Sequence, residues 1–258
     1  MGLYIETHIR AGLDELWART QDPARHQRWD LRFTEIHYLP RTEGEPQRFR
    51  YATRVLPFLT VAGTGVAAGE KERADGTRTS ALRFASPHPL SLIAEGSGYW
   101  RYVPDAHGVR FLTGYDYRPR WGLIGALADR LLFRPLMGWA TAWSFDRLRL
   151  WLERGITPER ARRNWLTELT VRALVLALCL TVLAHGSPPG LPGPLADATA
   201  YLCPLLLVPG VFLALFKAPL AGTPAARRCL RTPALRPRAP RLTKTPERQG
   251  PRAPETHG

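Results

Sequence analysis

Two strongly apolar segments in the C-terminal third constrain this chain most. They cover residues 171–184 and 200–216, and the turn-rich sequence HGSPPGLPGPLADAT separates them. A helix needs about 20 mostly apolar residues to cross a bilayer, a length that each segment reaches only with its flanks. We therefore expect a transmembrane hairpin with helices at about 166–185 and 199–217. Buried or interfacial helices are the alternative.

The basic residues around this hairpin predict its orientation. The connecting sequence contains no Lys or Arg, whereas basic residues stand before and after the hairpin, at Arg160, Arg162, Arg163, Lys217, Arg227, Arg228 and Arg231. Because positive residues are retained on the cytoplasmic side, both flanks are expected in the cytosol. The sequence thus predicts a multi-pass protein of the cell membrane whose N-terminal domain and C-terminal tail are cytoplasmic. Glu168 and Arg172, near one end of the first span, are expected to reach the headgroups.

The chain divides into three parts by composition: a domain at 1–157, a basic juxtamembrane segment with the hairpin at 158–217, and a tail at 218–258. The tail is rich in Pro and Arg and has few large apolar residues, so it is predicted to be disordered. Its positive charge is interpreted as an orientation signal or, alternatively, as a tether to anionic lipid or a partner. Nucleic acid is not expected as a partner, because no aromatic residues are interleaved with the arginines.

The N-terminal domain is expected to be mainly a β-sheet. Two short helices, at 11–20 and 23–29, follow a first strand at 2–9. Six further runs with strand character are separated by turn residues, at 31–39, 47–56, 60–71, 78–85, 90–103 and 108–117. Short turns between consecutive strands predict an antiparallel meander of about seven strands.

A helical segment at 121–152 ends this domain and is expected to break at Pro135. After the break, one stripe at helical spacing is predicted to lie across the sheet; it contains Leu136, Trp139, Ala140, Trp143, Leu150 and Trp151. Arg147 falls on the same stripe. It is either an edge residue whose charge reaches water or a polar anchor inside a pocket.

Several of these features together resemble a known family. They are the opening strand IETHI, the helix ending in ELW, the segment DPARHQRWD with Trp29, the strand GVRFLTGYDYRPRWG and the long final helix. Residues 3–154 are similar to the START-like superfamily of helix-grip domains, which includes Bet v 1, polyketide cyclases and coenzyme Q-binding proteins. The resemblance implies an α+β fold in which a curved antiparallel sheet grips the final helix around a cavity for a hydrophobic molecule.

Aromatic and basic residues on the late strands and the final helix are candidates for lining that cavity. They are Tyr51, Tyr99, Arg101, Tyr115, Tyr117, Trp143 and Arg147. Strand alternation places Tyr99 and Arg101 opposite to Trp100, so only one of these two sets can line the cavity.

Catalytic and metal-binding patterns are not found. The domain has no cysteine, its histidines have no partners identifiable from sequence, and Glu95, Asp116 and Arg83 are expected on the solvated face of the sheet. The glycines Gly63, Gly65 and Gly69 lie among strands and are interpreted as bends or bulges rather than a nucleotide loop. No catalytic residue, metal or cofactor is therefore assigned.

Three functions remain open from the sequence. The first is a membrane-anchored domain that binds or transfers a lipid or another hydrophobic small molecule. The second is an enzyme similar to polyketide cyclases and dehydratases, which requires a buried acid–base pair. The third is a noncatalytic membrane interaction module.

Overall fold

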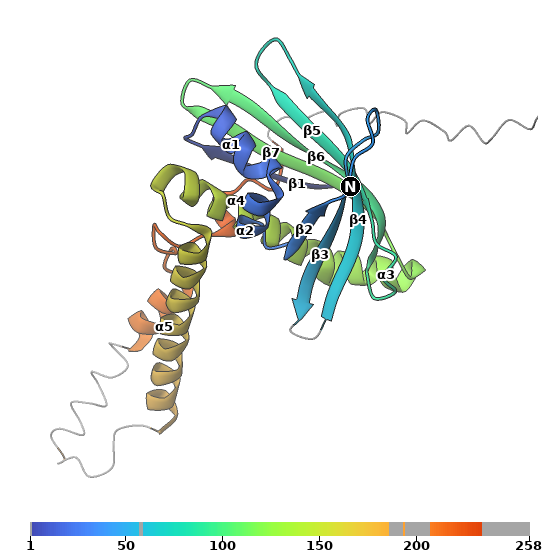
Figure 1. The fold of residues 1–258 in the computed structure, drawn as a ribbon. Coiled ribbons are helices and arrows are strands. Elements are labelled where there is room, and N and C mark those ends of the chain that lie inside the picture. The colour runs from blue at the N-terminus through green and yellow to red at the C-terminus, as the bar shows by residue number, and fades with distance from the viewer. Residues whose placement is uncertain (1, 57–58, 186–192, 194–206, 234–258) are drawn as a thin grey trace, which may run out of the picture.

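The computed structural model describes residues 2–56, 59–185, 193 and 207–233 (Figure 1). In chain order the elements are β1 (Leu3–Ile9), α1 (Leu13–Gln21), α2 (Pro23–Trp29), β2 (Glu35–Tyr38), β3 (Arg48–Leu56), β4 (Leu59–Glu72), β5 (Arg78–Ala85), β6 (Ile93–Asp105), β7 (Gly108–Pro119), α3 (Gly122–Ala128), a π-helical turn (Asp129–Phe133), α4 (Arg134–Arg154), α5 (Pro158–His185) and a short 3-10 helix (Ala226–Arg228).

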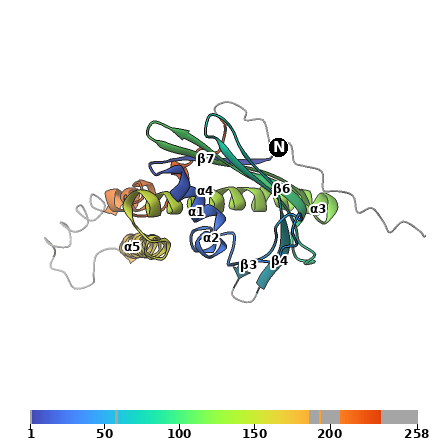
Figure 2. The ribbon, with the colours of Figure 1, turned by 45° about the horizontal axis from the view of Figure 1, so that its top comes forward.

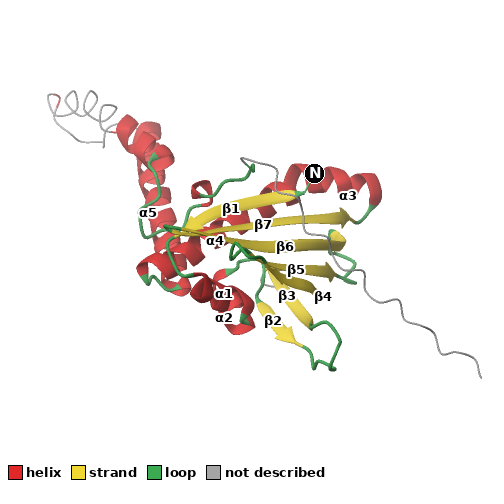
Figure 3. Ribbon diagram, turned by 90° about the horizontal axis from the view of Figure 1, so that it is seen from above, coloured by secondary structure: helices red, strands yellow, loops and turns green. Residues whose placement is uncertain are grey.

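The seven strands form one antiparallel sheet in the order β1-β7-β6-β5-β4-β3-β2 (Figure 3). The sheet is thus a meander from β2 to β7, with β1 added beside β7, and α4 runs along its inner side (Figure 2). This arrangement confirms the predicted α+β class, the seven strands and the long final helix. The predicted strand at 31–39 is shorter, because only Glu35–Tyr38 pairs with β3.

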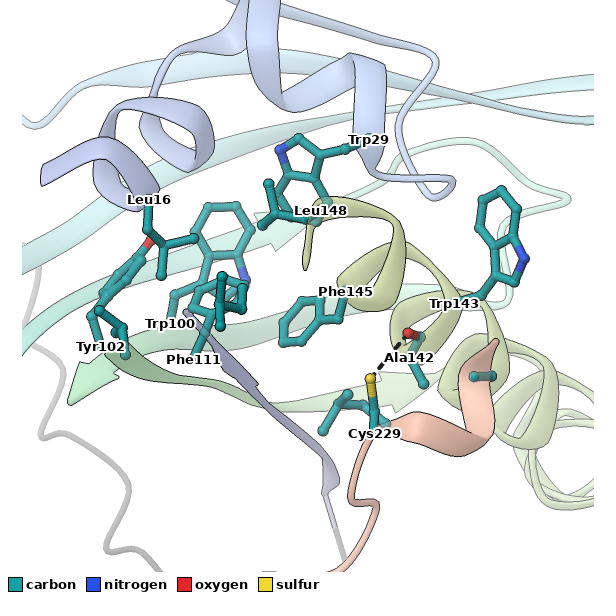
Figure 4. Close-up of a cluster of buried hydrophobic side chains, with 14 residues drawn as sticks. Leu16, Trp29, Trp100, Tyr102, Phe111, Ala142, Trp143, Phe145, Leu148 and Cys229 are labelled. Atoms are coloured by element: carbon teal, nitrogen blue, oxygen red, sulfur yellow. Dashed lines mark hydrogen bonds between the residues drawn. The ribbon is translucent and has the colours of Figure 1, made fainter. Parts of the chain in front are cut away.

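A core of aromatic and aliphatic side chains joins the inner face of the sheet to α4 (Figure 4). Phe111 of β7 stacks on Phe145 of α4 with their ring centroids 4.4 Å apart. Beside them, Tyr102 of β6, Leu16 of α1 and Leu148 of α4 are fully buried. Burial of such side chains stabilises the domain by about 1.5–3 kcal/mol each. The core therefore lies at the β1, β7 and β6 side of the sheet.

The prediction that the apolar stripe of α4 lies across the sheet is wrong, because another side of α4 faces the sheet. Phe145 and Thr141 face the sheet, whereas Trp143 and Trp139 pack against Trp165 of α5, at centroid distances of 5.7 and 6.2 Å. Trp151 instead lies under the guanidinium groups of Arg19 and Arg28, and Leu136 is 54% exposed. Because α4 is buried on almost every side between 138 and 150, its apolar periodicity does not identify the side that contacts the sheet.

The helical segment does not break at Pro135; it changes its helix type just before this residue. Asp129–Phe133 form a π-helical turn directly before α4, and Pro135 stands in the first turn of α4. Proline lacks the backbone N–H that an α-helix interior would use, so a first-turn position accommodates it. Helical structure therefore continues from Gly122 to Arg154 through this turn.

The segment after the second apolar region returns to the domain. The backbones of Glu6 and Leu230 exchange two hydrogen bonds of 2.9 and 2.8 Å, and the amide of Ala225 donates to Asp146 at 2.7 Å. The prediction of disorder for the whole tail is therefore wrong for 219–230. Residues 234–258 lie outside the described residues.

One described helix, Pro158–Thr181, has the length and composition needed to cross a bilayer. The second predicted span contains a shorter apolar helix, Leu207–Phe216, and its first residues lie outside the described part of the chain. Glu168 and Arg172 do not extend freely towards headgroups. They pair with each other, and Arg172 also donates to the carbonyl of Ala214 at 3.0 Å, near the end of the second helix.

Candidate functional site

Tyr115 and Tyr117 point from β7 towards the helices, at alternate positions of the strand. The hydroxyl of Tyr115 lies 2.9 Å from that of Thr141 on α4, and Tyr117 donates to the buried carboxylate of Asp129 at 2.5 Å. Burial raises the pKa of both tyrosines, so both stay protonated at neutral pH. Two neutral hydroxyl groups therefore lie between the sheet and the final helical segment.

A buried group of charged residues lies next to Tyr115, at the end of α2. Asp30 bonds to Arg32 at 2.6 Å and to His26 at 3.0 Å, and the guanidinium of Arg32 lies 5.6 Å from the centroid of the Tyr115 ring. Burial would raise the pKa of Asp30, but the charge of Arg32 and the bond from His26 outweigh it and hold that pKa well below its usual range. The pair Asp30 and Arg32 is therefore charged and internally neutralised.

His26 is buried under aromatic rings. It stacks on Trp29 at 5.0 Å between ring centroids and meets Trp100 and Phe33 edge-on at 4.8 and 5.2 Å. Burial lowers the pKa of His26, and the hydrogen bond to Asp30 offsets only part of this effect. His26 is consequently neutral at neutral pH. The sequence patterns did not predict this group; the spacing of His26 and Asp30 at i, i+4 is the signal that could have indicated it.

Aromatic side chains extend this inner face onto β3. The Tyr51 ring meets Phe33 edge-on at 5.6 Å and lies 6.4 Å from the ring of Phe49. Both β3 rings lie flat over glycines of β4: a Cβ atom at Gly63 would be 2.4 Å from Tyr51, and one at Gly65 would be 2.1 Å from Phe49. These two glycines make room for rings rather than bending the strand. Burial raises the pKa of Tyr51 to about 12.

Gly69 is the exception among the three β4 glycines. It has a φ of 134° and lies where the register between β4 and β5 shifts, as expected for a bulge. The interpretation as a bulge is therefore confirmed for Gly69.

Tyr99 and Arg101 lie on the opposite, outer face of the sheet. Tyr99 packs with Ala81 and Leu112, and the guanidinium of Arg101 lies 5.1 Å from the Tyr99 ring centroid. Because Trp100 points to the core, these neighbours must point away from it. The structure therefore separates Tyr99 and Arg101 from Tyr51, Tyr115 and Tyr117.

Trp143 and Arg147 belong to the junction between α4 and α5. Arg147 is only 6% exposed, its Nε donates to the carbonyl of Pro158 at 2.8 Å, and its guanidinium lies 5.3 Å from the Trp143 ring centroid. Burial lowers the pKa of Arg147 to about 10. This burial contradicts the interpretation of Arg147 as an edge residue that reaches water, whereas its role as a ligand anchor stays a prediction. The contacts of Arg147 position the start of α5.

Two shallow hollows among the described residues flank β1. One of about 400 Å³ is bordered by Thr7, Arg154 and Ala221, and one of about 200 Å³ by Leu3, Arg130 and Arg231. Neither is the enclosed cavity between the sheet and the helix that the resemblance implies.

The described part of the chain contains no candidate metal site, because no three of its His, Cys, Asp or Glu residues lie close enough together to hold an ion. Glu95 is exposed and pairs with Arg118 at 3.0 Å, and Asp116 is also exposed. Both carboxylates thus lie on the solvated face of the sheet, as predicted from the sequence.

The fold and this site define the class of the protein: an α+β domain with a helix-grip arrangement, followed by an apolar helix long enough for a bilayer. No family model matches the chain. Over 163 residues it is 50% identical to the uncharacterized membrane protein YndG of Bacillus subtilis (strain 168), covering 63% of this chain and 61% of that protein. The chain thus spans less than two thirds of this relative's length.

Similar solved structures include a lipid transfer protein and an aromatase/cyclase. A STAR-related lipid transfer protein from Xanthomonas axonopodis has a TM-score of 0.44 and 20% identity, over 58% of this chain and 84% of that one. The Zhui aromatase/cyclase from Streptomyces sp. R1128 has a TM-score of 0.41 and 15% identity, over 60% of this chain and 97% of that one.

Proposed function

We propose that this protein is a membrane-anchored helix-grip domain that binds a hydrophobic small molecule or lipid on the inner face of its sheet. The observation that carries the proposal is that the helices cover only part of this inner face. At β7 the aromatic side chains are buried against α4, whereas Phe49, Tyr51 and Phe84 on β3 and β5 are only half-buried. The helices pack chiefly on β1, β2 and β7. Because no described helix fully covers these three aromatic side chains, they offer a surface for an apolar ligand.

The polar groups beside this surface suit ligand orientation. Tyr51 reaches the edge of Phe33, and Phe33 lies next to the buried group of His26, Asp30 and Arg32. Apolar sites use a few placed polar groups to orient a ligand. The hydroxyl of Tyr51 and the guanidinium of Arg32 are the groups that we assign to this role.

Attachment to a bilayer rests on α5. Its apolar side chains are exposed along most of its length, with Leu174 and Leu178 each 64% exposed. Only 6% of the most apolar window of Pro158–Thr181 is buried inside the protein. Such a surface is unfavourable in water and favourable in hydrocarbon. The 50% identical relative from Bacillus subtilis is named a membrane protein, which supports the same assignment.

The chain leaves and re-enters the same domain, which constrains how it crosses the bilayer. Pro158 starts α5 beside Arg147, and Leu230 pairs with Glu6 after the second apolar helix. Both ends of the region between thus lie on the same side of any bilayer that it crosses, which calls for an even number of crossings. We propose two crossings, at about 166–185 and 199–217, with the domain on the cytoplasmic side as the flanking arginines indicate.

Native mass spectrometry with lipid extraction of the full chain, purified from its host membrane, tests the ligand proposal. The full chain is required, because 219–230 pack on the domain. We expect one bound hydrophobic molecule per chain, and a loss of most of it in the variant Phe49→Ala. The matched control Arg50→Ala changes an exposed neighbour on the same strand and should retain it. A chain that carries no molecule and takes up no added lipid would leave a noncatalytic interaction module as the better assignment.

His26 and Asp30 are the buried acid–base pair that a cyclase-like enzyme requires, and they favour this second function. Their hydrogen bond, however, is already part of the internally neutralised group with Arg32. Incubation of the native chain and of His26→Gln with a linear aromatic polyketide mimic tests it. Turnover by the native chain that disappears in the variant would establish the enzyme, and absence of turnover would reject it.

A further inference from the structure

An exposed apolar surface lies at the end of α4 opposite to α5. It covers α3, the π-helical turn and the start of α4, at helical spacing. Its most exposed members are Leu123, Ile124, Leu127, Leu131, Leu132 and Leu136. Leu123 is 90% exposed and Ile124 is 78% exposed, and Trp121 at the start of α3 is 48% exposed. Contiguous exposure of large apolar residues in one helical segment is typical of a protein or membrane contact.

Charge next to this surface favours a membrane over a protein. The hollow of about 200 Å³ at its border is lined by Arg130, Arg134 and Arg231 around Leu3 and Gly138. Of these arginines, Arg134 pairs with Asp129, whereas Arg130 and Arg231 are exposed. An apolar helical face bordered by arginines is the pattern of helices that lie in the interface of an anionic bilayer.

The position of this apolar surface relative to α5 also agrees with contact with a membrane. Figures 1 and 3 both place α3 on the side of the domain towards which α5 extends. Helix α4, with 21 residues, separates the two, which corresponds to about 30 Å along its axis. A bilayer entered by α5 would thus meet α3 at a second point.

We infer that the apolar face of residues 121–136 lies in the headgroup region of an anionic membrane, and that Arg130 and Arg231 contact lipid phosphates there. This inference deepens the proposed membrane anchoring and rests on it for the side on which the bilayer lies. Two attachments at opposite ends of α4 would set the orientation of the whole domain. The half-buried aromatic face would then be held at a constant angle to the lipid from which a ligand comes.

Lipid quenching in the full chain tests the contact. An environment-sensitive fluorescent amino acid replaces Leu123 in one sample and Lys71, at the opposite end of the sheet, in the control. The protein is reconstituted in phosphatidylcholine vesicles that contain phosphatidylglycerol, with bromine on the acyl chains of one lipid at a time. We expect a blue-shifted emission and strong quenching at position 123, and neither at position 71. A water-like emission at 123 overturns the inference, and so does a blue shift without quenching, because a second copy or a protein partner would then cover the face.

The arginines are tested by the choice of brominated lipid. For the native chain we expect stronger quenching by brominated phosphatidylglycerol than by brominated phosphatidylcholine. Each of Arg130→Gln and Arg231→Gln should lower this preference by about fivefold, since a basic residue near an anionic surface is favoured by about that factor. Arg73→Gln, in the exposed turn after β4, is the matched control. An unchanged preference in the double variant rejects the phosphate contacts.

Alkaline carbonate extraction separates this inference from the proposed anchoring. If carbonate releases the chain from the vesicles, the two crossings fail. Quenching at position 123 before extraction would still establish the contact of α3 with lipid. Retention of the chain together with a water-like emission at 123 would reject the α3 contact alone.

Discussion

The thiol of Cys229 donates a hydrogen bond to the main-chain carbonyl of Ala142, with 3.2 Å between the sulfur and the oxygen (Figure 4). This bond joins the segment after the apolar helices to the middle of α4. Burial raises the pKa of Cys229 to about 12, and the nearby carboxylate of Asp146 acts in the same direction. The segment that follows the second apolar helix is therefore fixed to the core of the domain.

Asp146 is the residue on which this attachment depends most. It is fully buried and accepts from the amide of Ala225 at 2.7 Å and from Arg228 at 2.8 Å. Replacing it with Ala removes the acceptor of the Ala225 amide, while Arg149 keeps Glu153 and Arg228 keeps main-chain carbonyls, so we expect a loss of about 1–3 kcal/mol of stability. Limited trypsinolysis gives the measurement: cleavage at Arg227 and Arg228 should accelerate in Asp146→Ala. The exposed Asp116→Ala should match the native rate, and equal rates for both variants would reject this role.

His26 should make the domain less stable in mild acid. The folded state holds the pKa of His26 below its usual value of about 6.5, so below this pH the unfolded chain binds a proton that the folded chain does not. Stability should therefore fall as the pH decreases from about 7 to 5. Asp30, whose pKa is also lowered, adds a further loss below about pH 4. Urea midpoints at pH 7 and pH 5 measure the effect. His26→Gln should flatten the difference, while His107→Gln, at an exposed turn, should retain it.

Gly65 should tolerate no side chain while Phe49 is present. A Cβ atom there would lie 2.1 Å from the Phe49 ring, so the ring or the strand must move. We expect Gly65→Ala to destabilise the protein by about 1–3 kcal/mol, as overpacking usually does. A double-mutant cycle with Phe49→Ala checks the cause, because the second change should make the first nearly neutral. Additive effects in the cycle would show that the glycine acts through its backbone instead. Thr64→Val, on the exposed face, serves as the control.

Arg147 should matter for stability and not for ligand binding. Its Nε bonds to the carbonyl of Pro158, where α5 begins. Arg147→Met removes this charge-assisted hydrogen bond between α4 and the start of α5, so it should cost about 1.5–3 kcal/mol. The amount of lipid that copurifies with the chain should stay unchanged. Loss of the lipid without loss of stability would return Arg147 to the role of ligand anchor.

Local patterns predicted much of the sheet. Alternation along β7 correctly separates Tyr115 and Tyr117 from their neighbours, because strand geometry fixes the face of each residue relative to the next. Alternation also sets Tyr99 apart from Trp100. It does not say which of the two faces the helix, since both are large aromatic residues, and the packing of α4 decides this.

The candidate site was predicted only in part for the same reason. Tyr51, Tyr115 and Tyr117 lie on the inner face, while Asp30 and Arg32 were not identified at all. Their sequence, WDLRF, resembles the start of an ordinary strand. Only the low exposure of the two side chains, 10% for Arg32 and 0% for Asp30, and their distance of 2.6 Å distinguish them from exposed residues.

The sequence by itself determined the features that depend on neighbours along the chain: the strand and helix periods, the turn residues, the apolar length of α5 and the basic residues around the hairpin. The tertiary structure alone decided the side of α4 that meets the sheet, the burial of Arg147 and the return of 219–230 to the domain. Each of these depends on a partner distant in sequence, as Cys229 depends on Ala142 and Leu230 on Glu6. A residue type indicates whether a side chain favours burial or a helix or strand, but it does not identify the distant residue that will contact it in the folded chain.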